Sequence, residues 1–244
     1  MRNQRGFTLV EIAIVLVIIG LLLGGILRGQ ELIQGARVRN VIDQQNGVRA
    51  AFFGFQDRFR LIPGNIPSTQ IAQVGNGANA STLGTAGTGA IAQTESPLVF
   101  QNLTATGFLS CGVCTATGPA GGTAANSPVN VYGGVLQVAT DTALAEKVGA
   151  ATFNNALTVA RTSSKTGNLI PSNVMAEIDV KADDGNAYTG NLRGSTWSAG
   201  NLNNPDIKVS CASGSTAAAS PWNNGQSAAP GGAIAANCGG GMLF

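Results

Sequence analysis

Residues 6–27 read GFTLVEIAIVLVIIGLLLGGIL, and this apolar stretch decides the fold of the chain. As a helix rising about 1.5 Å per residue, the run from Phe7 to Leu27 would be roughly 30 Å long, which is the thickness of a bilayer's hydrocarbon core. Its only charged residue is Glu11. The stretch predicts a single transmembrane helix at about 7–27.

The residues before this run predict its orientation. Arg2, Arg5 and the amino terminus carry positive charge, which favours a cytoplasmic leader and an exported remainder. A secretory signal would have a shorter apolar core followed by small residues of A-x-A type, and no such site follows here. We therefore expect a single-pass membrane protein with its N-terminus in the cytoplasm and its C-terminal part exported.

Glu11 is an energetic anomaly in this segment. A carboxylate in a spanning helix costs on the order of 2.5 to 3.5 kcal/mol unless a partner compensates it. The position of Glu11 near one end would also suit an acid that only reaches the headgroups. A compensating partner would give it a specific role.

The string from Arg5 to Glu11, RGFTLVE, followed by an aliphatic stretch, closely resembles the processing motif of type IV prepilins and of type II secretion pseudopilins. The resemblance implies that a prepilin peptidase/methyltransferase cuts after Gly6 and methylates the new amino group of Phe7. It also implies that Glu11 pairs with the N-terminal amine of a neighbouring subunit in a helical filament built by inner-membrane assembly machinery. That amine exists beside Glu11 only after cleavage.

Composition limits the other functions. Without Arg2 and Arg5, 12 basic and 12 acidic side chains remain, and no nucleic-acid partner is indicated. The chain has no histidine, which removes the commonest general base and most zinc sites. We predict that the protein is not an enzyme and needs no cofactor.

The helix is predicted to continue to residue 60. Apolar residues recur there at spacings of three and four, which predicts an amphipathic helix packed on the body: Leu32, Ile33, Ala36, Val41, Ile42, Val48, Ala51, Phe52, Phe55 and Phe59. Pro63 and Gly64 end the pattern. The segment 61–65, LIPGN, resembles an L-P-G-D type element of some pilin-like proteins and predicts a rigid turn.

The remainder, 61–244, is predicted to be one exported globular domain. Residues 71–96 and 115–128 are rich in small and polar residues and predict surface loops, while 131–139, 156–160 and 207–210 have strand-like composition. Ser172 is expected to cap a short helix through Ala182. The expected fold is α+β and pilin-like, a long N-terminal helix packed on a small antiparallel sheet with long loops.

Three acids fall in the segment 178–185, IDVKADDG, which resembles an element of the same pilin-like subset. Asp179, Asp183 and Asp184 invite a calcium hypothesis because hard cations take several oxygen ligands. Their spacing is not that of an EF-hand, and Asp-Gly indicates a turn. We favour a capped turn over a metal site.

Four cysteines, at 111, 114, 211 and 238, lie on the expected exported side, where disulfides are the default. Three pairings are possible. Proximity favours Cys111 with Cys114 and Cys211 with Cys238, and the second loop resembles the disulfide-bounded region of many type IV pilins. C-x-x-C redox spacing and a zinc site are weaker alternatives, because no strand-helix unit precedes Cys111 and the other two cysteines lack paired spacing.

The leading hypothesis is a structural subunit of a type IV pilus or pilus-like filament, located in the periplasm or on the cell surface after assembly. The first alternative is a type II secretion pseudopilin that drives protein export. The second alternative, from a different class, is a monomeric binding module whose apolar helix only anchors it. An enzyme ranks last because no nucleophile and base can be paired from these residues.

Overall fold

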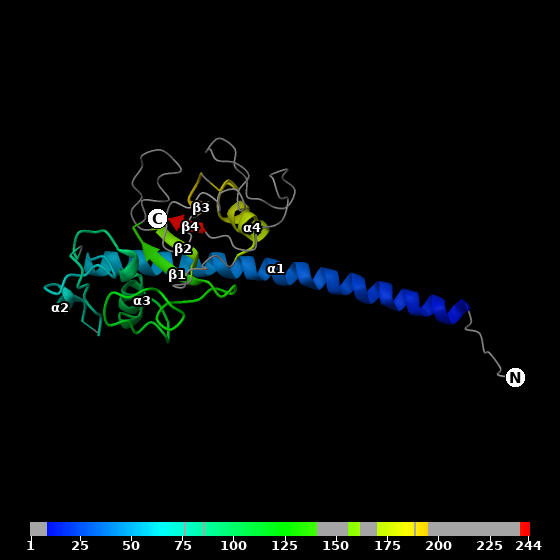
Figure 1. Ribbon diagram of the computed structural model, residues 1–244, viewed down its shortest axis with the longest axis horizontal. Helices are drawn as coiled ribbons and strands as arrows, with labels where there is room; N and C mark the ends of the chain where they lie inside the picture. Colours follow the sequence, from blue (N-terminus) through cyan, green and yellow to red (C-terminus); the bar gives the residue numbers. More distant parts are fainter. Residues whose placement is uncertain are drawn as a thin grey trace. The chain divides into compact units, whose positions relative to one another are not determined.

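The computed structural model describes residues 9–75, 77–84, 86–140, 156–161, 170–187, 189–194 and 240–244. The chain divides into two compact units, Met1–Arg39 and Asn40–Phe244. Helix α1, Leu9–Phe59, contributes residues to both and is followed by a small mixed domain with few strands (Figure 1). The predicted long apolar helix followed by such a domain is confirmed.

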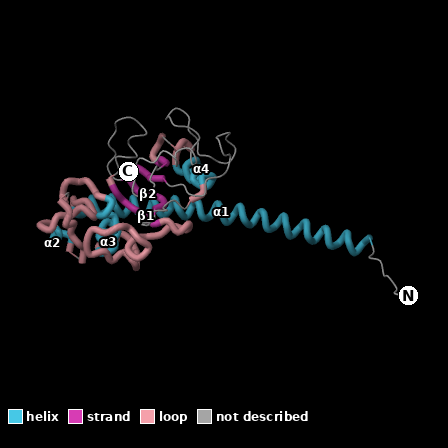
Figure 2. Tube along the Cα trace, in the orientation of Figure 1, coloured by secondary structure: helices cyan, strands magenta, loops and turns pink. Residues whose placement is uncertain are grey.

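The elements after α1 are short. They are α2 (Ile71–Val74), the 3-10 helix η1 (Gln93–Glu95), α3 (Ser96–Ala105), β1 (Val135–Ala139), β2 (Ala156–Arg161), α4 (Ser172–Ala182), β3 (Leu192–Gly194) and β4 (Gly240–Leu243). Loops and turns make up most of the chain between α1 and β1 (Figure 2). This proportion agrees with the high glycine content of the sequence, since 34 residues are glycine.

Helix α1 has 51 residues and ends where the sequence pattern predicted. Arg60 adopts a left-handed conformation with φ 58°, and its N–H donates to the carbonyl of Gln56 at 2.8 Å. A residue in this conformation just after the last turn is a common helix stop. Helix α1 thus ends one residue before the predicted end at residue 60, and Phe7 and Thr8, at its predicted start, lie outside the described residues.

The four strands pair in the order β1-β2-β4-β3, and each neighbouring pair is antiparallel. The edge of β1 that faces away from β2 is hydrogen-bonded to residues outside the sheet. The N–H of Val138 donates to the hydroxyl of Ser96 at 2.9 Å, and the N–H of Leu136 donates to the carbonyl of Pro128 at 2.9 Å. These bonds satisfy edge groups that would otherwise be open to pairing with another strand.

The core of the second unit forms between the last turns of α1, helix α3 and strand β1. Phe52 and Phe55 are fully buried, and Phe100 of α3 and Leu136 of β1 belong to the same cluster. Phe244, just after β4, stacks edge-on against Phe52 with ring centroids 5.0 Å apart. The aromatic residues at the end of α1 therefore join segments that are distant in sequence.

The glycine of the predicted turn at 61–65 is required by its neighbours. Gly64 has φ 81°, and its N–H donates to Oδ1 of Asn102 at 2.7 Å. A Cβ at this position would collide with the side chain of Val99 and would lie 2.9 Å from its backbone nitrogen. Only glycine satisfies both the backbone angle and this close approach to α3.

Two predictions about helices were wrong in part. Leu32 and Ile33 of the expected packed stripe are 71% and 56% exposed, so the buried stripe does not begin there. Ser172 does not cap α4, because it is the first helical residue and Pro171 occupies the N-cap position without a side-chain bond. The expected strand at 207–210 lies outside the described residues.

The segment 71–96 is not simply a surface loop. It holds the short helix α2 and the 3-10 helix η1, and it buries Val74, Ser81, Ile91 and Glu95. The expected strand at 131–139 is shorter, because residues 131–134 form a turn in which the N–H of Gly133 donates to the carbonyl of Asn130 at 2.9 Å. Small and polar composition indicated loops, but it did not reveal which of their residues are buried.

Candidate functional site

The candidate site is the amino-terminal segment. Glu11 is the acidic residue of the first turn of α1, and its side chain is exposed. The amide groups of a first turn carry partial positive charge, so a carboxylate there is electrostatically favoured. The predicted processing residues, Gly6 and Phe7, lie outside the described residues.

The surface around Glu11 is apolar and uncovered. Every large aliphatic side chain between Leu9 and Leu27 is exposed, from 46% for Ile19 to 86% for Leu9. A Cβ added at Gly20, Gly24 or Gly25 would meet nothing within 4 Å. Within the described residues, α1 is the one helix long and apolar enough to cross a membrane.

Charged residues begin directly after this apolar surface. Arg28 pairs with Glu31 at 2.7 Å, with 80% and 68% of their side chains exposed. An exposed pair at this spacing adds little stability. It does mark the position beyond which the helix carries charged side chains that need water.

The three acids of the calcium hypothesis lie together. Ligand oxygens of Asp179, Asp183 and Asp184 are within 4.8 Å of one another, and Asp179 is buried. Oδ2 of Asp183 accepts a hydrogen bond from the N–H of Leu192 at 3.0 Å, and Oδ1 of Asp184 accepts one from the N–H of Asn186 at 2.9 Å. Two of the three carboxylates therefore accept hydrogen bonds from backbone N–H groups, one in the turn that follows α4 and one at the start of β3.

Two glycines fit this turn. Gly185 and Gly190 have φ 76° and 73°, and a Cβ on Gly190 would collide with the carboxylate of Asp183. Left-handed glycines together with carboxylates bound to backbone N–H groups are the features of a capped turn. Calcium binding at the three acids stays a hypothesis beside the capped turn.

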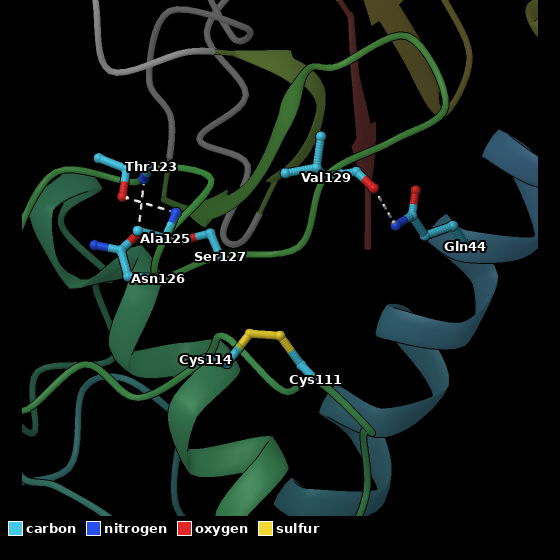
Figure 3. Close-up of a disulfide and its surroundings, with 8 residues drawn as sticks. All are labelled: Gln44, Cys111, Cys114, Thr123, Ala125, Asn126, Ser127 and Val129. Carbon is cyan, nitrogen blue, oxygen red and sulfur yellow. Dashed lines mark hydrogen bonds between the residues drawn. A yellow bond between two sulfur atoms is a disulfide. The ribbon is translucent and has the colours of Figure 1, made fainter.

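Cys111 and Cys114 form a disulfide with their Cα atoms 5.4 Å apart (Figure 3). The N–H of Cys114 also donates to the carbonyl of Cys111 at 3.3 Å, and Cys114 is 3% exposed within the core cluster. Cys111 begins a tight turn and does not lie at a helix N-terminus. Cys211 and Cys238 lie outside the described residues, so their pairing remains a prediction.

Removing this disulfide is expected to destabilise the domain modestly. In the chain-entropy model a loop of four residues contributes about 2 kcal/mol, which corresponds to roughly 4 to 8 °C in melting temperature for a domain of this size. Thermal unfolding of the double variant Cys111→Ala, Cys114→Ala would measure the loss. An unchanged melting temperature relative to the oxidised wild-type chain would contradict a stabilising role.

A buried carboxylate that the sequence did not reveal holds the segment after α1. Glu95 is fully buried, and its carboxylate accepts hydrogen bonds from the N–H of Ala92 at 2.7 Å and from the hydroxyl of Ser81. The side-chain amide of Asn65 lies 3.4 Å from both carboxylate oxygens and accepts from the N–H of Gly89 at 3.1 Å. Glu95 thus joins the turn after α1 to the loop before α3.

Residues 1–27 match the family model of the prokaryotic N-terminal methylation motif. Neither a curated protein nor a solved structure matches the chain. The match covers the segment whose residues resemble a type IV prepilin signal and includes Gly6, Phe7 and Glu11.

The motif indicates a precursor of type IV pilin or pseudopilin type, which is a structural class of protein. It implies processing by a prepilin peptidase and assembly with other pilin subunits. The apolar helix near the N-terminus also fits an inner-membrane anchor.

Proposed function

We propose that this chain is a structural subunit of a type IV pilus or pilus-like filament. The leader 1–6 is removed after Gly6, Phe7 is N-methylated, and the subunit polymerises through its N-terminal helix. The domain 61–244 is exported and has a pilin-like fold, with the second half of the helix packed on an antiparallel sheet. The protein acts by assembling and catalyses no reaction.

The observation that carries this proposal is the methylation motif at residues 1–27. The geometry of the described part supports it in two ways. The aliphatic surface from Leu9 to Leu27 is uncovered in the single chain, so it needs lipid before assembly and other helices afterwards. Glu11 stands at the start of that surface, where a neighbouring N-terminal amine would compensate its charge.

The N-terminus tests the proposal directly. Mass spectrometry of the chain from membranes that contain the peptidase should find it beginning at methylated Phe7. The variant Gly6→Val should keep Met1, because the bulkier side chain blocks the cut, whereas Gly20→Val should be processed normally. Met1 retained in the wild-type chain, or Phe7 exposed without methylation, would favour the monomeric membrane-anchored module.

Recovery of surface filaments distinguishes a pilus subunit from a type II secretion pseudopilin. A pilus subunit should be abundant in filaments sheared from the cell surface, since that fraction contains the assembled pilus. A processed and methylated chain that is missing from this fraction, and whose deletion stops export of secreted proteins, would favour the type II secretion pseudopilin.

A further inference from the structure

Helix α1 contains a segment whose own residues oppose its helical state. The segment is Gln44-Gln45-Asn46-Gly47, called here the amide segment. We propose that α1 opens locally at the amide segment while the turns that follow it stay folded. This property concerns the single chain and goes beyond the proposed filament function.

Gln45 of the amide segment is buried, and Gln44 is half-buried, and both carry buried side-chain atoms without hydrogen-bond partners in the described part of the chain. Gln45 is 1% exposed, and within the part of the chain that the structure describes neither Nε2 nor Oε1 of this residue has a hydrogen-bond partner. Gln44 donates from Nε2 to the carbonyl of Val129 at 3.2 Å, as Figure 3 shows, while its Oε1 has no partner there. A buried polar group without a hydrogen bond opposes folding, and opening the helix would let water reach it.

The next two residues weaken the helix through the backbone. Asn46 and Gly47 are exposed, and both have low helix propensity, glycine the lower of the two. A Cβ added at Gly47 would meet nothing within 4 Å, so no neighbour within the chain requires glycine at this position. Packing within the chain therefore does not explain why position 47 is glycine, although Gly47 favours opening more than the other residues of the segment.

The turns that follow are held firmly. Val48, Phe52 and Phe55 are each at most 1% exposed and belong to the core cluster with α3 and β1. Opening should therefore stop before this packed face. Four residues rise about 6 Å as a helix and span up to about 13 Å when extended, so opening would lengthen the chain by as much as roughly 7 Å.

Hydrogen exchange of the full chain in detergent micelles tests this proposal. Backbone amides of residues 45–51 lie in the amide segment or, for 48–51, donate to its carbonyls in the helix. They should exchange faster than those of 52–59 and with little dependence on denaturant, because only a local opening exposes them. Gly47→Ala should slow their exchange about fivefold. The matched control Gly35→Ala, also on α1 with open space around its Cβ, should leave it unchanged.

A second variant tests the buried amide separately. Gln45→Met keeps the length of the side chain and removes its polar atoms, so the same amides should exchange roughly tenfold more slowly. The proposal is overturned if residues 45–51 exchange no faster than 52–59, or if Gly35→Ala slows them as much as Gly47→Ala. Exchange that is unchanged in Gln45→Met would exclude the buried amide as a cause of the opening.

Discussion

Glu11→Ala is expected to abolish filament assembly while leaving membrane insertion and cleavage intact. The substitution removes one half of the proposed pair and leaves the methylated amine of a neighbouring Phe7 without a partner between packed helices. Breaking a buried ion pair in this way costs about 3 to 5 kcal/mol, a factor of more than about a hundred at each subunit contact. Filaments sheared from cells and quantified against membrane-bound subunit would measure the loss.

Glu31→Ala is the matched control for this experiment. Glu31 is the other acid of the first unit, and its pair with Arg28 is exposed, so its removal should change filament yield little. Both variants should begin at methylated Phe7 by mass spectrometry. Wild-type filament yield from Glu11→Ala would refute the pairing role, and a failure of Glu11→Ala to be cleaved would place the defect before assembly.

Glu95→Ala is expected to lower the free energy of unfolding by about 3 to 5 kcal/mol. It leaves the N–H of Ala92 and the hydroxyl of Ser81 without their buried acceptor and opens a cavity between η1 and the turn after α1. For a domain of this size the melting temperature should fall by roughly 10 °C. Thermal unfolding of the full chain, followed by near-ultraviolet circular dichroism, would measure it.

Glu177→Ala provides the comparison. Glu177 pairs with Lys181 one turn along α4, with side-chain exposures of 30% and 39%, and its loss should cost less than about 1 kcal/mol. If Glu95→Ala were no more destabilising than Glu177→Ala, the buried carboxylate would not hold this segment. The loss in free energy of unfolding caused by Glu95→Gln should lie between the losses caused by Glu177→Ala and Glu95→Ala, because glutamine keeps the side-chain volume and one acceptor oxygen.

The features predicted correctly depend on residues that are close in sequence. The end of α1 near residue 60 agrees with the stop signals at Pro63 and Gly64, which act within a few positions. Strand β2 and helix α4 also follow local composition. The processing motif is a short contiguous string, so it could be recognised although no relative of the rest of the chain matches.

The features that were missed depend on burial, which a window of sequence does not contain. Glu95 lies in a segment of small and polar residues that predicts a surface loop, yet the turn after α1 and the loop before α3 enclose it. Ser172 has the composition of a helix cap, but Pro171 takes that position. Leu32 and Ile33 continue the apolar periodicity although they are exposed in the single chain.

The sequence by itself determined the N-terminal motif, the membrane-length helix and the position of Glu11, because each is a property of contiguous residues and of a helix that needs only local hydrogen bonds. Only the tertiary structure decided which polar groups are enclosed: the carboxylate of Glu95 with its donors, and the amide of Gln45 without partners among the residues described. Enclosure depends on segments that are distant along the chain and meet only on folding, and the free energy of a buried polar group depends on the partners it finds there.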